Sequence, residues 1–139
     1  LYAPASVTPS DRHTARSLME AVGAAVYVDS EEAIDAVTAI SGSGPAYFFL
    51  MAEALEEAGR ALGLPGDTAK ALARQTLIGA GAVLAADARD AASLRLAVTS
   101  PGGTTQAALG VLDGDRKALR ALIEEATSAA FARARELTS

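Results

Sequence analysis

The segment Val98–Leu109, "VTSPGGTTQAAL", places glycines and hydroxyl side chains where one helix would end and another begin. Pro101 is expected to stop the preceding helix, because proline lacks a backbone N–H and clashes with the previous turn. Gly102 and Gly103 permit backbone angles and close approaches that a side chain would forbid. The next helix is expected to start at Thr104 or at the threonine after it.

A helix start of this kind can bind a small anion. Its first N–H groups have no intrahelical acceptor, and the helix dipole favours negative charge there. Nearby hydroxyls add further donors, so the segment suits a carboxylate or a phosphate. An ordinary helix–turn–helix with a threonine cap explains the same residues. The candidate site residues are Ser100, Gly102, Gly103, Thr104 and Thr105.

A second glycine-containing break, "SGSGP" at Ser41–Pro45, precedes a long apolar stretch. It contains Gly42-x-Gly44, but Tyr47 stands where a dinucleotide fingerprint requires glycine, and the lysine of a phosphate-binding loop is absent. We expect Ser43 or Gly44 to cap the following helix instead.

Other polar residues have simpler explanations than chemistry. His13 and a serine could belong to a hydrolase triad, but no nucleophile-elbow motif surrounds any serine. The remaining candidates fall on helices, where they are expected to form solvated faces: Glu53, Glu56, Glu57, Arg116, Lys117 and Arg120.

Composition narrows the fold and the function classes. The chain has 139 residues, 50% of them hydrophobic and only 4% aromatic, so small aliphatic residues must fill the core. Alanine is the best helix former, which favours a mainly α domain. The net charge of −5 argues against a nucleic-acid partner, and a single histidine without cysteine argues against a metal site. The uncharged runs are interrupted or too short to span a membrane.

Hydrophobic spacing predicts helices over 11–22, 31–39, 45–62, 67–86, 90–98, 104–112 and 115–137, with a strand at 24–28. Expected caps are Ser10 or Asp11 for the first of these helices and Asp67 or Thr68 for the fourth, with Gly63 ending the third. Glycines inside the fourth helix, Gly79 and Gly81, suggest that another backbone comes close.

Two features suggest partners that this sequence does not contain. The stretch 47–52 is apolar on every side, which favours a homodimer through the long helices. A lone strand needs a sheet, and the chain opens on Leu1, so we expect a piece of a longer protein. The expected boundary lies near Ser30, with residues 1–30 as the end of one domain and 31–139 as a helical domain.

Two motifs, "IDAVTAISGSGPAYFFLMAEAL" at 34–55 and "VTSPGGTTQAALGVL" at 98–112, resemble pyrroline-5-carboxylate reductase. "GLP" at 63–65 and the terminal "ARELTS" also fit. The resemblance implies reduction of an imine to L-proline with NADPH or NADH, in proline biosynthesis in the cytoplasm. It implies an N-terminal Rossmann domain and a helical C-terminal domain like that of 6-phosphogluconate dehydrogenase. Members form interlocked homodimers, and some form decamers.

The resemblance also implies residue roles. The N–H groups of Gly103, Thr104 and Thr105 would hold the substrate carboxylate, with Ser100 nearby. The Thr105 hydroxyl would bond the ring nitrogen, which makes it the expected catalytic residue.

Two implications concern what this chain lacks or changes. "DARDAAS" at 87–93 departs from relatives that carry an acidic residue and a His-Pro pair there, so no role is carried over from it. The cofactor-binding residues would lie upstream, so the chain alone is expected to be inactive. The alternatives are a related imine or 2-keto-acid reductase and a non-catalytic helical dimerisation module.

Overall fold

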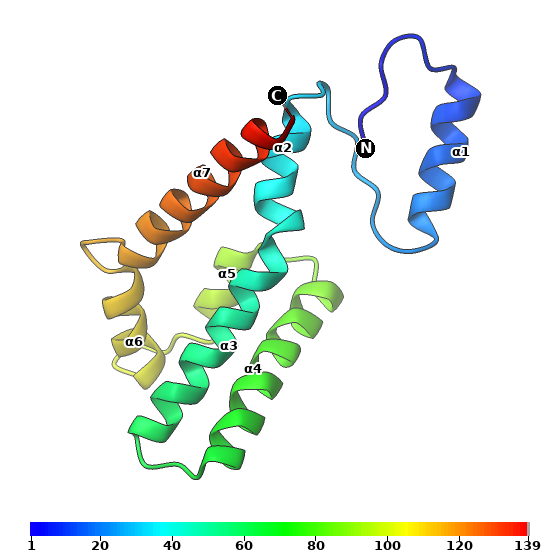
Figure 1. The fold of residues 1–139 in the computed structure, drawn as a ribbon. Helices are drawn as coiled ribbons and strands as arrows, with labels where there is room; N and C mark the ends of the chain where they lie inside the picture. The colour runs from blue at the N-terminus through cyan, green and yellow to red at the C-terminus, as the bar shows by residue number, and fades with distance from the viewer. Residues whose placement is uncertain (139) are drawn as a thin grey trace. The chain divides into compact units, whose positions relative to one another are not determined.

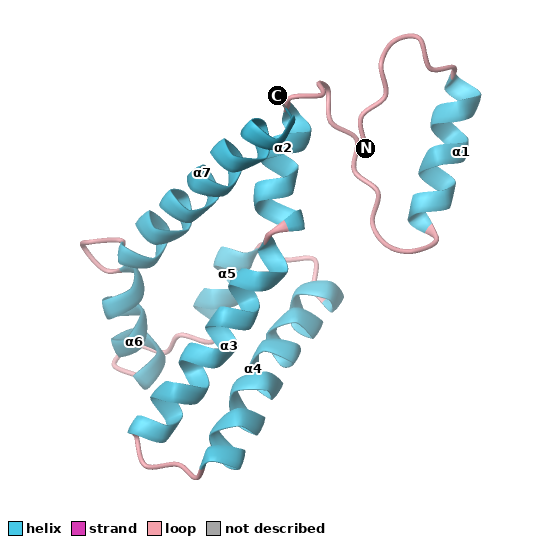
Figure 2. Cartoon of the chain, viewed as in Figure 1, coloured by secondary structure: helices cyan, strands magenta, loops and turns pink. Residues whose placement is uncertain are grey.

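The computed structural model describes residues 1–138, and its regular structure there is helical, with no strand among the described residues (Figures 1 and 2). The mainly α fold expected from composition is therefore confirmed. The chain divides into two compact units, Leu1–Ser43 with Ala126–Ser139, and Gly44–Glu125. Each unit is described by itself.

The first unit begins with helix α1 (Pro9–Glu20). Thr8 is its N-cap, and the Thr8 side chain accepts a hydrogen bond from the Asp11 amide at 3.2 Å. The predicted cap at Ser10 or Asp11 is wrong by two or three residues. Proline fits the first helical position, where its missing N–H costs nothing, and this moves the start toward Thr8.

The strand expected at 24–28 is not formed. Within residues 1–138 its backbone is bonded to Leu1, whose amino group donates to the Val26 carbonyl at 2.6 Å and whose carbonyl accepts from the Val28 amide at 2.8 Å. A strand needs a ladder of such bonds from a neighbouring strand. One residue cannot supply that ladder, so the segment is irregular.

The predicted break at Ser41–Pro45 is a helical transition instead. Helix α2 (Ala33–Val37) runs directly into a π-helical turn, η1 (Thr38–Gly42). The Ser41 hydroxyl donates to the Val37 carbonyl at 3.0 Å. Ser43 has helical angles (φ −83°, ψ −23°), so it is not the extended N-cap that the sequence predicted.

The second unit is built on a helical hairpin. Helices α3 (Gly44–Ala61) and α4 (Gly66–Ala86) pack against each other. Gly63 ends α3 as predicted, with φ +92° and a 6→1 bond from the Leu64 amide to the Gly59 carbonyl at 3.1 Å. Pro65 precedes α4, so the predicted cap at Asp67 or Thr68 is wrong.

Close packing of the hairpin depends on small residues. A Cβ at Gly59 would lie 3.1 Å from the Ala69 Cβ, and Ala69 and Ala73 are 2% and 5% exposed. With Ala39 they are the buried hydrophobic residues of the described chain, and no large side chain is fully buried there. The core within this chain is therefore thin.

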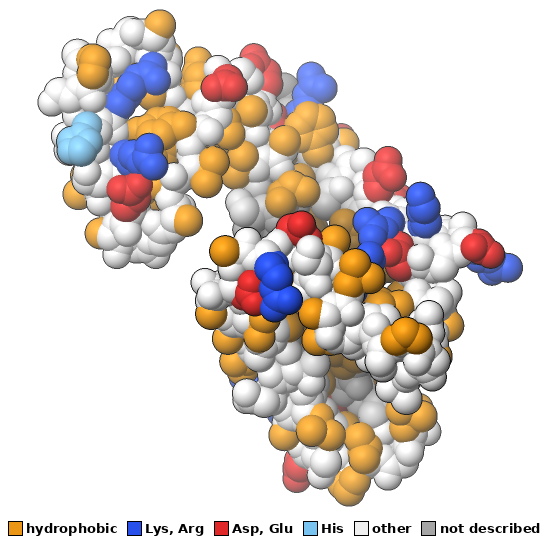
Figure 3. Space-filling view, turned by 180° about the vertical axis from the view of Figure 1, so that it is seen from behind, with side chains coloured by type: hydrophobic (Ala, Val, Ile, Leu, Met, Phe, Trp, Pro, Cys, Tyr) orange, Lys and Arg blue, Asp and Glu red, His pale blue; other side chains and the backbone are white. Residues whose placement is uncertain are grey.

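Large hydrophobic side chains lie at the surface instead (Figure 3). The accessible area is 10537 Å², whereas a compact monomer of 14.0 kDa exposes about 6,700 Å². A Cβ at Gly79 or Gly81 would meet nothing within 4 Å, so the close approach predicted at these glycines is not made within this chain.

Helices α5 (Ala91–Ala97), α6 (Thr104–Asp113) and α7 (Ala118–Thr138) complete the chain. The predicted segments at 90–98 and 104–112 are confirmed within one or two residues. The last helix was predicted from 115 but begins at Ala118, because Lys117 has φ 46°, outside the helical region.

The end of α6 offers a matched pair of glycine substitutions. A Cβ at Gly114 would overlap the Gly110 carbonyl oxygen, whereas one at Gly110 would meet nothing within 4 Å. We expect Gly114→Ala to lower the free energy of unfolding by about 1–3 kcal/mol through overpacking. Gly110→Ala should raise it by up to about 1 kcal/mol, since alanine favours a helix interior. Denaturant unfolding at one protein concentration measures both, and equal effects would contradict the overlap.

Candidate functional site

The candidate site lies between α5 and α6. Helix α5 ends at Ala97, one residue before its predicted end, and α6 begins at Thr104, as the sequence predicted. Thr99 continues the end of α5, because its amide donates to the Leu96 carbonyl at 3.0 Å and its hydroxyl to the Arg95 carbonyl at 2.6 Å. These bonds close the last turn of α5 before the chain reverses.

The two glycines have the roles that their type predicts. Gly102 has φ +71°, which L side chains rarely adopt. A Cβ at Gly103 would lie 2.5 Å from Ser100 Oγ and 3.1 Å from the Ser100 carbonyl oxygen. The expected backbone freedom and close approach are both confirmed, so this turn requires glycine at each position.

The start of α6 presents unpaired donors. Its N-cap is Gly103 (φ −80°, ψ 168°), without a capping side chain, and the Ala107 amide makes the bond to the Gly103 carbonyl at 3.2 Å. The amides of Thr104, Thr105 and Gln106 precede that first turn and so have no acceptor inside the helix. The alternative of a threonine cap does not describe this helix. Thr105 is half-buried, while Ser100 and Thr104 are exposed.

The preceding amides are already engaged. The Gly103 amide donates to the Ser100 carbonyl at 3.1 Å, and the Gly102 amide donates to Gln106 Oε1 at 2.6 Å. Of the three amides expected to hold a carboxylate, those of Thr104 and Thr105 remain available. The role of Gln106 was missed, although glutamine at the third helical position is a known signal for a side chain that folds back.

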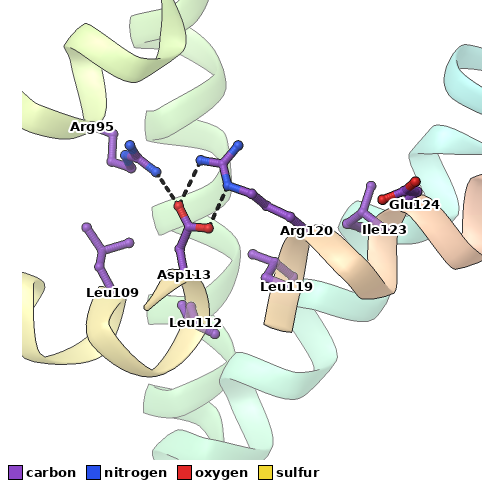
Figure 4. A pocket seen from close by; sticks show the side chains of 8 residues that line it. All are labelled: Arg95, Leu109, Leu112, Asp113, Leu119, Arg120, Ile123 and Glu124. Carbon is purple, nitrogen blue, oxygen red and sulfur yellow. Dashed lines mark hydrogen bonds and ion pairs between the residues drawn. The ribbon is translucent and has the colours of Figure 1, made fainter. Parts of the chain in front are cut away.

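A charged cluster joins the three helices around this segment (Figure 4). Arg95 Nη1 donates to Asp113 Oδ2 at 2.8 Å. Arg120 Nε donates to Asp113 Oδ1 at 2.6 Å, and its Nη2 donates to Oδ2 at 2.8 Å. The expectation that Arg120 only forms a solvated face is corrected, because this side chain bridges α7 to α6.

The two guanidinium groups keep Asp113 ionised. Hydrogen bonds from Arg120, and then from Arg95, lower the pKa of Asp113 to about 2. Because the pKa is lowered, the interaction is complete above the ordinary range near 4 and is lost only as the pH falls toward 2. The cluster borders a pocket of about 480 Å³ lined by Arg95, Leu109, Leu112, Asp113, Leu119, Arg120, Ile123 and Glu124.

The segment before α5 is also fixed by carboxylates. Arg89 donates to Asp87 at 2.6 Å, and its hydrogen bonds lower the pKa of Asp87. Asp90 is the N-cap of α5 and accepts from the Ser93 amide at 2.7 Å, which lowers the pKa of Asp90. Both side chains are therefore committed to local structure and ionised near neutral pH.

Other candidates from the sequence do not form sites. His13 is exposed on α1, and the Ser41 hydroxyl is bonded to the backbone. Glu56 pairs with Arg60 within α3. Residues 1–138 contain no group of three or more histidine, cysteine or acidic side chains placed to hold a metal ion. In the same part of the chain, every helix is too short or too polar to cross a membrane.

The glycine pair of the second break does not form a dinucleotide-binding turn. Gly42 ends a π-helical turn and Gly44 begins a helix, so the pair does not follow a strand as a phosphate-binding turn would.

Sequence comparisons identify related proteins. Residues 31–137 match the family model for the pyrroline-5-carboxylate reductase dimerisation domain. The chain is 46% identical over 137 residues to pyrroline-5-carboxylate reductase of Pseudomonas aeruginosa, covering 99% of this chain and 50% of that protein. The enzyme of Haemophilus influenzae is 41% identical over 138 residues, with 99% and 50% coverage. The chain thus spans about half the length of these relatives.

Solved structures agree with the sequence matches. A pyrroline-5-carboxylate reductase from Coxiella burnetii superimposes with a TM-score of 0.90 at 44% identity, over 98% of this chain and 50% of that one. Pyrroline carboxylate reductase of Plasmodium falciparum, solved with NADP bound, gives 0.80 at 28% identity, over 98% and 51%.

Proposed function

Because the chain belongs to the pyrroline-5-carboxylate reductase family, we propose that it supplies the dimerisation and substrate-binding part of an enzyme that reduces the imine of 1-pyrroline-5-carboxylate to L-proline with NADPH or NADH. The observation that carries this proposal is the start of α6, where the amides of Thr104 and Thr105 have no acceptor within the helix and follow a glycine turn. Such a start suits the carboxylate of a small cyclic amino acid.

We assign the substrate contacts as follows. The amides of Thr104 and Thr105 hold the carboxylate, and Ser100 lies beside the turn that presents them. The Thr105 hydroxyl bonds the ring nitrogen and favours the developing amine. Gly102 and Gly103 contribute their backbone conformation rather than their N–H groups, since those are bonded within the turn.

We propose that the proton on the ring nitrogen comes from water, or that the substrate binds already protonated, as the iminium ion. The carboxyl groups flanking the site segment, Asp87, Asp90 and Asp113, all have a lowered pKa. Ionised carboxylates cannot donate a proton near neutral pH. This chain's part is then to fix and orient the ring.

The remaining half of the reductase is proposed to bind the nucleotide, as a neighbour with bound NADP suggests. On this view residues 1–30 end that domain and 31–139 form the helical domain, in a cytoplasmic enzyme. The unpaired segment at 24–28 would then find its sheet there.

We propose that the exposed apolar helices are covered by a second copy of the chain, with a decamer as a possible higher assembly. The family model is one of dimerisation, and the excess exposed area of the chain fits it. The open glycines of α4, Gly79 and Gly81, would let the partner approach closely.

The role of Thr105 is testable in the complete reductase. We expect Thr105→Ala to lower kcat/KM for pyrroline-5-carboxylate by about tenfold or more, since a lost hydrogen bond costs about 1.4 kcal/mol. Thr105→Ser, which keeps the hydroxyl, should retain most of the activity. Steady-state kinetics decide this, and an alanine variant with unchanged kinetics would remove Thr105 from the site. Faster turnover of another imine or of a 2-keto acid by the wild type would favour a related reductase.

A further inference from the structure

Charge and partial burial together hold α6 in this chain, because Thr105 and Leu109 are half-buried and a charged cluster lies at the end of the helix. None of its ten residues is buried, and none of the seven residues of α5 is buried either. The Gly110 position of α6 has no neighbour within 4 Å of an added Cβ. Hydrophobic packing inside this chain therefore leaves α6 weakly held.

Asp113 lies at the last position of α6 and connects this helix to both neighbours. Arg95 reaches it from α5, the helix that ends just before the site segment, and Arg120 reaches it from α7 (Figure 4). The Asp113 side chain is only 16% exposed, so water competes little for its oxygens. Hydrogen bonds between a guanidinium and a carboxylate at these distances are strong, and two parallel bonds from one guanidinium also fix its orientation.

The bridge from Arg95 to Asp113 connects the last turn of α5 to the last residue of α6. Thr105 and Asp113 are eight residues apart on one helix, which is about 12 Å. If α6 tilted by roughly 10° about its far end, the Thr105 backbone would move by about 2 Å. A shift of that size would take the amides of Thr104 and Thr105 out of hydrogen-bond distance of a bound carboxylate and so weaken substrate binding.

We propose that Asp113, held by Arg95 and Arg120, is a positioning residue that fixes α6 so that the amides of Thr104 and Thr105 meet the substrate carboxylate. This inference rests on the proposed function for the identity of the ligand. The orientation of α6 itself does not depend on that identity.

The test is the Asp113→Asn variant of the complete reductase, with steady-state kinetics for both substrates. We expect KM for pyrroline-5-carboxylate to rise about tenfold or more, kcat to change less than about threefold, and KM for the nucleotide to stay unchanged. Asp113→Glu, which keeps the carboxylate, should restore most of the affinity. The matched control is Glu56→Gln, which removes the ion pair with Arg60 on α3 and should leave both KM values unchanged.

A merely structural role would give a different pattern. It would lower the active fraction, seen as a lower kcat and a lower midpoint of thermal unfolding, with KM unchanged, and that result would overturn the proposal. If Asp113→Asn does not fold, Arg95→Gln and Arg120→Gln each remove one of the two ion pairs and should each raise the same KM by a smaller factor. Unchanged KM in both would equally overturn it.

A second measurement needs no activity. Amide hydrogen exchange at 107–113, where the amides are bonded within α6, should become at least about tenfold faster in Asp113→Asn, while α3 and α4 exchange as in the wild type. If the wild type does not reduce pyrroline-5-carboxylate, the proposed function fails. Faster exchange in Asp113→Asn would still show that Asp113 holds α6 in place. Unchanged exchange at 107–113 would contradict a role of Asp113 in holding α6, whatever the substrate.

Discussion

Replacing Thr104 by aspartate is expected to raise KM for pyrroline-5-carboxylate about a hundredfold or more in the complete reductase, without loss of helix stability. Thr104 is the first residue of α6 and is exposed. Two carboxylates about 4 Å apart repel by about 4 kcal/mol at an effective dielectric constant of 20. Screening at this exposed position reduces the repulsion. A remaining repulsion of about 2.7 kcal/mol would raise KM a hundredfold.

The same substitution should stabilise the helix itself. A negative charge in the first turn interacts favourably with the helix dipole, by about 0.3–1 kcal/mol. A gain or no change in thermal stability together with a large rise in KM separates substrate binding from folding. Thr104→Asn has nearly the same shape without the charge and should keep KM within about threefold of the wild type.

The decisive comparison is between the KM values of Thr104→Asp and Thr104→Asn. If the aspartate and asparagine variants have equal KM values, no substrate anion binds at this helix start. Added salt provides a further check, because the rise in KM should shrink as ionic strength increases.

Replacing Ile78 by aspartate is expected to weaken dimerisation about a thousandfold. Ile78 is 59% exposed on α4 and lines an apolar groove with Phe48 and Phe49 of α3. In a monomer the new carboxylate would remain in water at little cost. In the proposed dimer it would be removed from water, and Arg74 of the same groove would offset part of the cost, which is about 3–5 kcal/mol for an unpaired buried charge.

Sedimentation equilibrium over a range of protein concentrations measures this effect. Ile78→Leu keeps the apolar area and should dimerise like the wild type. A dimer of unchanged affinity in the aspartate variant would show that the partner does not cover this part of α4. The interface with a second copy of the chain would then have to lie elsewhere on its surface.

The helices and the site segment could be read from local patterns. The glycine pair before Thr104 predicted a turn with φ > 0 and a close approach, and Gly102 and Gly103 supply them. Gly63 predicted the end of α3 for the same reason. Each of these features depends on residues within one or two turns of one another, which a linear sequence displays directly.

Errors occurred where the local signal was ambiguous or a partner was needed. Pro9 and Pro65 moved helix starts away from the polar residues that were expected to cap them. The π-helical turn at Thr38–Gly42 carries glycine and serine, which also suit a break. The residues 24–28 have strand-forming side chains, but Leu1 supplies just two backbone hydrogen bonds to them, and no neighbouring strand is present among the described residues.

Local sequence patterns were enough to predict the helical fold class, the resemblance to a reductase family and a candidate anion-binding site at the start of α6. The tertiary structure decided which amides of that start remain available and what holds α6 in place. Arg95 lies 18 residues before Asp113 and Arg120 seven after it, so no helical spacing marks them as partners. An ion pair depends on the positions of charged atoms in space, and those positions exist only once α5, α6 and α7 are folded together.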